Sequence, residues 1–208
     1  MTIKPKELKI DPYNLIITGV GGQGNVTASR ILGNMLSNKG YYITIGETFG
    51  ASQRGGSVMS HLRISAEETC SPLIPKGRGH MVVAMEPSEA IRVLAEYGNM
   101  EIKVISNTRP IYPVGVIAGE QAYPSLEDIK ERVNDISDQA WFINATDESL
   151  AMMKNPVYGN IMLLGAVAAT GELPIERADF EIIISETMPP DKVALNLRAY
   201  DRGLEMLL

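Results

Sequence analysis

Cysteine and histidine are scarce in this chain of 208 residues, which contains one cysteine, Cys70, and two histidines, His61 and His80. A single cysteine excludes an intrachain disulfide and an iron–sulfur centre held by this chain alone. Two histidines and one thiol are also too few for a typical structural zinc site. We therefore expect no metal bound by the chain alone. Cys70 has no cationic neighbour in the sequence that would activate its thiolate, so we interpret it as structural.

Long apolar runs and basic tracts are also missing. No stretch reaches membrane-spanning length, and the polar residues 1–14 lack the apolar core of a signal peptide. We therefore expect a cytoplasmic protein without a membrane partner. No basic run with interleaved aromatic residues is present, so nucleic acid is not an expected partner. The composition, 45% hydrophobic and 21% charged, is that of a globular domain rather than a disordered segment.

The net charge of −6 is unevenly distributed along the chain. Residues 1–110 contain 12 lysines and arginines against 9 acids, whereas residues 111–208 contain 7 against 16. This difference favours an anionic ligand or partner for the amino-terminal half. A solvated acidic surface in the other half would explain the same numbers almost as well.

The apolar periodicity indicates alternating strands and helices. Strands are expected over 14–18, 41–45, 57–64, 80–85, 101–106 and 140–144, and helices over 25–39, 87–97, 126–136, 157–171 and 189–207. The strand at 57–64 alternates apolar and polar residues, which predicts a half-exposed or interface strand. The helix at 157–171 is apolar on nearly all sides, so its own core or another subunit must cover it. We predict a single α/β domain over 1–208, a three-layer Rossmann-like fold with a mostly parallel sheet and a long loop around 107–125.

The first candidate site is the glycine-rich turn between the strand at 14–18 and the helix at 25–39. Gly19, Gly21 and Gly24 fit the pattern G-x-G-x-x-G, in which glycines allow a tight turn and let a ligand approach the backbone. The helix that follows would direct its first N–H groups toward negative charge. Gly22 and Gln23 complete the turn, and the Gln23 amide can donate to a ligand or to neighbouring backbone.

Two alternative functions follow from this turn alone. A dinucleotide site also needs an acid about 20 residues further on to hold the ribose, and Glu47 lies 23 residues after Gly24. An NAD(P)-dependent oxidoreductase is therefore one alternative, although no Ser-Tyr-Lys or His-Asp catalytic set stands out. A nucleotide-sensing interaction protein without catalysis is the other.

The second candidate site is an unusual loop in which an arginine stands among glycines. Between the strands at 41–45 and 57–64, pliable backbone surrounds several hydrogen-bond donors: Gly50, Gln53, Arg54, Gly55, Gly56 and Ser57. An arginine held in this way can present its planar fork to a carboxylate or a phosphate. We expect a functional or interface role for this loop rather than an ordinary surface ion pair.

Together, these segments resemble the gamma-type subunit or domain of the 2-oxoacid:ferredoxin oxidoreductases. The resemblance is carried by GVGGQG at 19–24, ASRILG at 28–33, Glu47, QRGGSV at 53–58 and SHLRI at 60–64. Further segments are similar to the separate beta subunit of indolepyruvate oxidoreductase: SPLIP at 71–75, EPSEAIRVL at 86–94, NTRPI at 107–111, NIMLLGA at 160–166 and LNLRAYDRG at 195–203. One departure is Phe49-Gly50-Ala51, where relatives tend to have His-Gly-Met.

The resemblance implies oxidative decarboxylation of a 2-oxoacid, with indolepyruvate or another aryl pyruvate as the expected substrate. That chemistry needs thiamine diphosphate with Mg²⁺ and [4Fe–4S] clusters. The resemblance implies that a larger partner subunit carries them, that coenzyme A accepts the acyl group and that ferredoxin accepts the electrons. This chain would then contain no catalytic residues and would be inactive alone. Ligand or partner contacts are expected at Gly19, Gly21, Gly22, Gln23, Gly24, Glu47, Gln53, Arg54, Gly55, Gly56, Ser57 and Asn160.

Overall fold

The computed structural model describes residues 5–50 and 56–208. Its strands are β1 (Tyr13–Val20), β2 (Tyr42–Phe49), β3 (Ser57–Ser65), β4 (Met81–Ala84), β5 (Lys103–Asn107) and β6 (Gln139–Ile143). Its helices are α1 (Asn25–Asn38), α2 (Pro87–Tyr97), α3 (Val114–Ile117), α4 (Leu126–Asp135), α5 (Ala145–Met153), α6 (Gly159–Ala169), α7 (Arg177–Thr187) and α8 (Pro190–Glu205), with a 3-10 turn η1 (Pro156–Tyr158) before α6. Within the described ranges, no helix is both long and apolar enough to cross a bilayer.

The strands form one six-stranded sheet in the order β2-β3-β1-β4-β5-β6. β1, β4, β5 and β6 run parallel to their neighbours in that series, whereas β3 is antiparallel to both β1 and β2. The predicted α/β fold with a mostly parallel sheet is therefore confirmed. The carboxyl ends of β1, β4, β5 and β6 lie at one edge, where open α/β sheets bind ligands.

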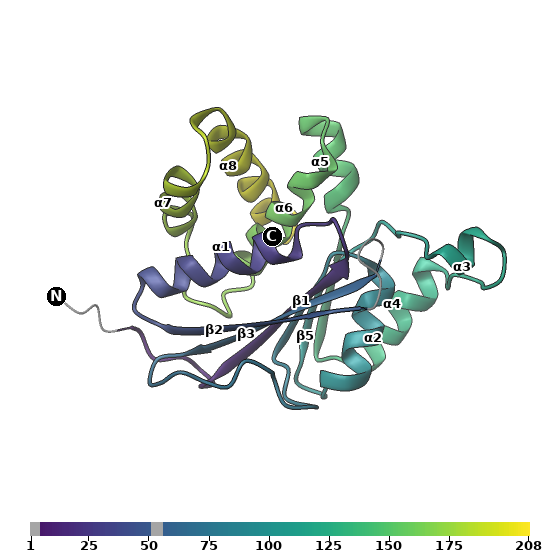
Figure 1. The fold of residues 1–208 in the computed structure, drawn as a ribbon, viewed down its shortest axis with the longest axis horizontal. Coiled ribbons are helices and arrows are strands. Elements are labelled where there is room, and N and C mark those ends of the chain that lie inside the picture. The colour runs from purple at the N-terminus through teal and green to yellow at the C-terminus, as the bar shows by residue number, and fades with distance from the viewer. Residues whose placement is uncertain (1–4, 51–55) are drawn as a thin grey trace.

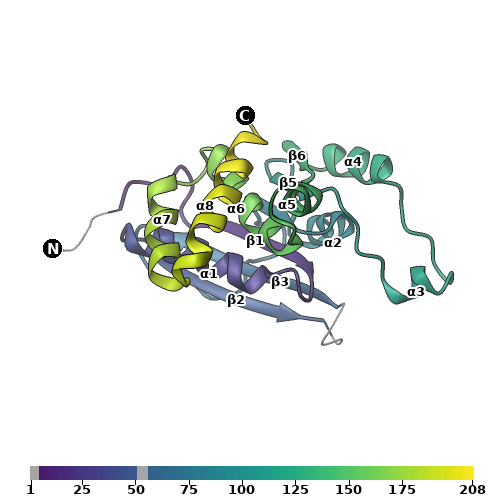
Figure 2. The same ribbon diagram turned by 90° about the horizontal axis from the view of Figure 1, so that it is seen from above.

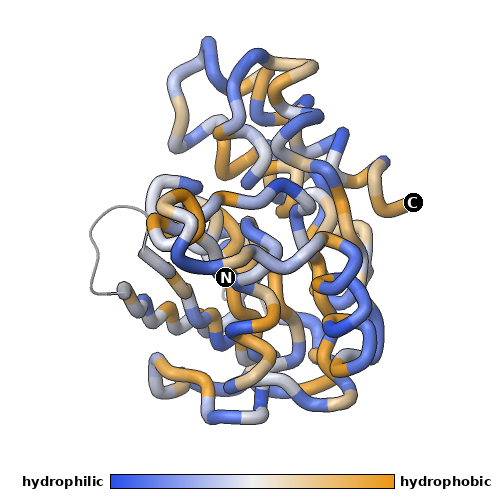
Figure 3. The backbone as a smooth tube through the Cα atoms, turned by 90° about the vertical axis from the view of Figure 1, so that its right-hand side faces the viewer, coloured by the Kyte–Doolittle hydropathy of each residue, from blue (hydrophilic) through white to orange (hydrophobic). Residues whose placement is uncertain are grey.

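Helices cover both faces of the sheet, which gives the three layers (Figures 1 and 2). On one face, Leu15 and Ile17 of β1 belong to a large core that includes residues of α1, α6, α7 and α8. On the other, Ile16 of the same strand belongs to a smaller core with residues of α2 and α4. Successive strand residues point to opposite faces, so one central strand supplies both cores. Figure 3 shows the hydrophobic segments as orange stretches along the strands and packed helices.

Helix α6 is buried by the chain's own helices. Gly165 of α6 and Gly203 of α8 lie where the two helices meet, and a Cβ atom at either position would collide with the backbone oxygen of Tyr200 or Met162, respectively. Two glycines therefore let the helix backbones approach closely. The apolar helix at 157–171 is expected to be buried either by the chain's own core or by another subunit. The structure shows burial by the chain's own core.

Local signals in the sequence account for several helix boundaries. Glu86 caps α2 by accepting from the backbone N–H of Glu89, and Pro87 is the first helical residue. Ser125 and Asp128 form the capping box of α4. Gly40 has a φ of 92° directly after the last residues of α1, a left-handed conformation that glycine adopts without strain.

Other expectations were wrong. β3 is not half-exposed: its neighbours β1 and β2 flank it, Leu62 and Ile64 enter the larger core, and Met59 enters the smaller one. Residues 145–153 and 177–187 are helices that the periodicity did not indicate. The long segment around 107–125 contains the short helix α3, none of whose residues is buried.

Candidate functional site

The glycine-rich turn connects the carboxyl end of β1 to the first residue of α1, as its sequence predicts. Gly22 and Gly24 have φ values of 104° and 87°, conformations that other residues adopt only with strain. Gly24 stands at the N-cap position of α1 and supplies no side-chain cap. The N–H of Gly21 donates to the carbonyl oxygen of Gly56 at 2.9 Å, so this turn contacts the end of the second glycine-rich loop.

Gln23 is used within the chain. Its Oε1 accepts from the backbone N–H of Val20 at 2.7 Å, and its Nε2 donates to the carbonyl oxygen of Met85 at 2.8 Å. Of the two uses expected for this amide, the structure therefore shows bonding to neighbouring backbone. The bonds fix the glycine-rich turn against the end of β4.

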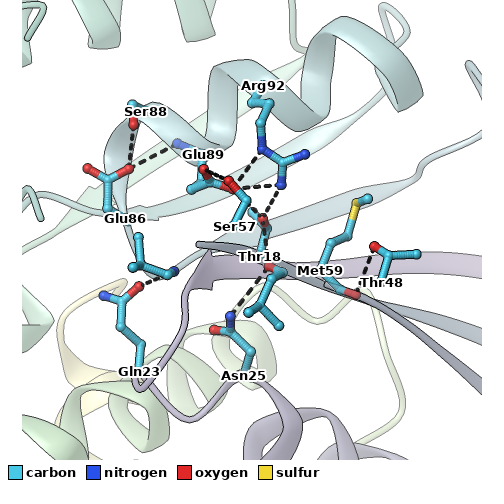
Figure 4. Close-up of polar contacts among 12 residues, drawn as sticks. Thr18, Gln23, Asn25, Thr48, Ser57, Met59, Glu86, Ser88, Glu89 and Arg92 are labelled. Carbon is cyan, nitrogen blue, oxygen red and sulfur yellow. Dashed lines mark hydrogen bonds and ion pairs between the residues drawn. The ribbon is translucent and has the colours of Figure 1, made fainter. Parts of the chain in front are cut away.

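A network of polar side chains joins β1, β3 and α2 beside this turn (Figure 4). Ser57 donates to Glu89 Oε1 at 2.6 Å, while Thr18 and Arg92 donate to Glu89 Oε2 at 3.2 Å and 2.6 Å. Three donors and a guanidinium charge thus compensate the burial of one carboxylate. Ser57, a predicted site residue, is held in place by this network.

Glu86, the N-cap residue of α2, forms a second group of hydrogen bonds at the amino terminus of this helix. Its side chain accepts from the hydroxyl of Ser88 at 2.6 Å, from the hydroxyl of Tyr123 and more weakly from the N–H of Ile111 at 3.4 Å. Burial raises the pKa of Tyr123, and the hydrogen bond to Glu86 raises it further, so the phenol remains a donor. Glu86, which is 1% exposed, thereby holds both ends of the segment that carries α3.

A cavity of about 540 Å³ opens at the same edge of the sheet. Its lining is mainly apolar, with a few polar side chains: Gly21, Gly22, Gln23, Met85, Asn107, Arg109, Ile111, Thr146, Leu150, Pro156, Val157, Gly159, Asn160 and Leu163. The side-chain amide of Asn107 donates to the carbonyl oxygen of Met85 and to the hydroxyl of Thr146. The backbone N–H of Thr146 in turn donates to Asn107 Oδ1. The cavity therefore has a polar wall held in place by hydrogen bonds across β4, β5 and α5.

The structure brings some of the predicted residues together and separates others. Asn160, the second residue of α6, lies beside the glycine-rich turn, where its Nδ2 donates to the carbonyl oxygen of Gln23 at 3.4 Å. Glu47 lies on the edge strand β2, and β3 separates it from β1. Its position is therefore not that of a ribose acid on a strand next to the glycine turn, as a dinucleotide site requires. The predicted residues Gln53, Arg54 and Gly55 lie outside the described residues.

Four residues that the sequence analysis did not single out shape this edge: Glu86, Glu89, Asn107 and Arg109. The first two signalled only a helix start, because acids near a helix amino terminus are common. Asn107 and Arg109 appeared in the sequence as part of a loop. Asn107 ends β5 and Arg109 follows it, whereas Glu86 and Glu89 follow β4. That β4 and β5 are parallel neighbours becomes known only with the strand order.

One histidine is buried in the core. His61 is fully buried, its Nδ1 accepts from the N–H of Ile74 at 3.5 Å, and its ring meets Tyr97 edge-on. Burial lowers its pKa, while the charge of Glu96 opposes this shift. Among the described residues, no three side chains of histidine, cysteine, aspartate or glutamate cluster in a way that could hold a metal ion.

Comparison with known families gives a match over most of the chain. The sequence pattern of the family described as pyruvate ferredoxin/flavodoxin oxidoreductase matches residues 14–206. Indolepyruvate oxidoreductase subunit IorB of Pyrococcus horikoshii is 36% identical over 194 residues, which are 93% of this chain and 95% of the relative.

Solved structures share the fold. The pyruvate oxidoreductase subunit PORC of Thermotoga maritima matches with a TM-score of 0.69 at 21% identity, over 94% of this chain and 97% of the other. The 2-oxoglutarate:ferredoxin oxidoreductase of Magnetococcus marinus, solved with 2-oxoglutarate, coenzyme A and succinyl-CoA bound, matches with a TM-score of 0.73 at 17% identity. That match covers 96% of this chain but 31% of the longer one.

Proposed function

Because the chain belongs to the pyruvate ferredoxin/flavodoxin oxidoreductase family, we propose that it is the cofactor-free subunit of a 2-oxoacid:ferredoxin oxidoreductase. In this proposal a larger subunit binds thiamine diphosphate, Mg²⁺ and [4Fe–4S] clusters. Thiamine diphosphate stabilises the carbanion formed on decarboxylation, and the clusters pass single electrons to ferredoxin. Coenzyme A accepts the acyl group.

The scarcity of ligand groups in this chain is the observation that carries the proposal. One cysteine cannot bind a cluster that needs four thiolates, and the sequence contains no GDG segment that would begin a thiamine diphosphate–metal motif. The residues present therefore do not fit either group. The chain corresponds to 31% of the longer Magnetococcus protein, which supports a division of labour between this polypeptide and a larger one.

Indolepyruvate, or another aryl pyruvate, is the 2-oxoacid that we propose for the complex. The name of the Pyrococcus relative and the 36% identity over nearly the full length of both chains support this choice. The reacting centre for this acid would lie on the partner subunit.

We propose that the carboxyl edge of the sheet faces the larger subunit. The glycine-rich turn at 19–24 shapes this edge, Ser57 and Asn160 fix its neighbours, and Glu47 with Gln53 and Arg54 would contact the partner or its ligand. Phe49, which stands where relatives tend to have histidine, is 64% exposed at the end of β2. An exposed phenylalanine next to the proposed rim contributes apolar contact area instead of an imidazole.

Purification from native cells and reconstitution test the proposal. A tagged chain should retain a larger iron–sulfur protein, and the complex should reduce ferredoxin or a viologen dye when indolepyruvate and coenzyme A are added. The isolated chain should show no such activity. Turnover by the isolated chain, or a purified complex that contains no iron–sulfur subunit, would overturn the division of labour. Tight NADH binding by calorimetry would instead favour the dehydrogenase alternative.

A further inference from the structure

The cavity at the carboxyl edge is large enough for a small molecule and is built mainly from apolar walls. Its volume, about 540 Å³, is within the range of ligand pockets, and Met85, Leu150 and Leu163 give it an apolar side. These three residues come from the end of β4, from α5 and from α6, so secondary structure supports the wall. An aryl ring would bury its faces there without contacting charge.

The charge carried by the described residues that line the cavity is positive. Among the described residues that line the cavity, Arg109 is the only ionisable one, and no acid is present. Arg109 also contacts Asp147, but both side chains are about half exposed and such a pair contributes little to stability. The guanidinium can therefore direct some of its N–H donors toward an anion in the cavity.

Three helices begin at the cavity wall. The turn before α1, Thr146 in the first turn of α5, and Gly159 with Asn160 at the start of α6 all line it. Helices α1 and α5 have no hydrogen bond from an N-cap side chain, and their positive ends add to the charge of Arg109. The acids of the α5 first turn, Asp147 and Glu148, pair with Arg109 and Arg202 and do not line the cavity.

Two side chains offer further hydrogen bonds. The Thr146 oxygen accepts from Asn107, which leaves its own hydrogen free to donate. Asn160 is 7% exposed, lines the cavity and has a side-chain oxygen without a partner among the described residues. Its single bond to Gln23 is long, 3.4 Å, so a small rotation of the amide would present that oxygen to a ligand N–H.

We propose that this cavity binds an aryl carboxylate: a carboxylate group lies at Arg109 and Thr146, a ring lies against the apolar wall, and a ring N–H reaches Asn160. The proposal deepens the proposed function and rests on it for the choice of an indole ring. Nucleotides share the anionic chemistry, but the described residues of the lining include no aromatic ring to stack on a base and no acid to hold a ribose.

Binding to the isolated full-length chain is the direct test, with indole-3-acetate as a stable probe. Amide NMR shifts should change at Gly22, Thr146 and Asn160. Indole-3-ethanol, which keeps the ring but lacks the carboxylate, should bind at least tenfold more weakly because it loses a charge-assisted hydrogen bond. Adenosine 3′,5′-bisphosphate tests whether a nucleotide binds the cavity through its phosphates instead. It should not change the NMR shifts of these amides.

Matched variants separate the cavity from the rest of the surface. Arg109→Gln should weaken binding of indole-3-acetate at least tenfold, whereas Arg132→Gln on the exposed part of α4 should leave it within twofold. Val157→Trp should block the cavity from its half-exposed rim, whereas Ile182→Trp, at a similarly exposed position of α7, should not.

The proposal is overturned if indole-3-acetate at millimolar concentration shifts none of the lining amides, if Arg109→Gln binds as the natural chain does, or if only the nucleotide binds. A complex that forms and turns over while the isolated chain fails to bind would reject this inference and keep the proposed function. Binding by the isolated chain, combined with a purification from native cells that recovers no iron–sulfur subunit, would keep the cavity assignment and reject the proposed function.

Discussion

The hydroxyl of Ser57 donates a 2.6 Å hydrogen bond to Glu89, and this bond joins the first residue of β3 to the first turn of α2. The second oxygen of the same carboxylate accepts from Thr18 of β1 and from Arg92. Glu89 therefore connects three elements that are distant in sequence at the edge of the sheet where the glycine-rich turn begins.

Replacing Glu89 by glutamine should destabilise the fold. The amide keeps the shape but removes the negative charge opposite Arg92 and turns one acceptor into a donor, so we expect a loss of about 2 kcal/mol in the free energy of unfolding. Glu96→Gln on the same helix is the control, because the Lys76–Glu96 pair is exposed and contributes little. Urea denaturation at pH 7 measures both. Equal losses in the two variants would show that the network does not stabilise the protein.

The segment that carries α3 should become more mobile when Tyr123 is replaced by phenylalanine. The change removes the phenol donor to Glu86 and leaves a buried carboxylate with one partner fewer. Hydrogen exchange of the amides in 111–124 should accelerate severalfold, while exchange in β1 should not change. Tyr112→Phe is the control, since Tyr112 meets Tyr123 edge-on through its ring, which this change keeps. Unaltered exchange in Tyr123→Phe would show that the segment is held by other contacts.

Much of the helical structure follows from local signals, which act within a few residues of each helix end. The capping box at Ser125 and Asp128, the Glu86-Pro87 helix start and Gly40 after α1 each satisfy backbone groups nearby. The strand order was not accessible in this way. That β3 pairs with β1 on one side and β2 on the other depends on contacts between residues tens of positions apart, such as Gly19 with Val58 and Tyr42 with Ser65.

The same limit explains what the sequence missed in the site. The glycine-rich turn was recognisable because glycine positions report directly on backbone conformation. The sequence did not indicate that the Gln23 side chain bonds to Met85, because the two residues are 62 positions apart. Glu47 has suitable spacing for a ribose acid, but an intervening strand separates it from the turn. Spacing along the chain measures distance in space only when the neighbouring strands are known.

Gly165→Ala should destabilise the protein by about 3 kcal/mol, because the added methyl group meets the backbone of α8 and not a side chain that can move. Gly33→Ala is a matched control in the middle of α1. There the nearest atoms are the ends of the Ile45 and Ile43 side chains, and the higher helix propensity of alanine, about 1 kcal/mol, offsets the crowding. Thermal unfolding followed by circular dichroism compares the two. Equal stability of both variants would contradict the close packing of α6 on α8.

Stability should fall as the pH decreases below about 6.5, the ordinary pKa of histidine in an unfolded chain. Burial lowers the pKa of His61, opposed by Glu96. Burial also lowers the pKa of His80, opposed by Glu101 and reinforced by Arg78. The unfolded chain therefore takes up protons in a range where the folded chain remains neutral, and by linkage acid favours unfolding.

His80→Gln isolates one part of this effect. The Nδ1 of His80 accepts from the backbone N–H of Asn14 at 2.9 Å, and a glutamine oxygen can replace that acceptor without titrating. Urea midpoints at pH 7.5, 6.5 and 5.5 should decline less steeply in the variant than in the natural chain. The remaining decline reports His61, because most carboxylates titrate near pH 4 and lie below this window. A midpoint that rises between pH 7.5 and 5.5 in the natural chain would mean that the two imidazoles gain rather than lose protons on folding.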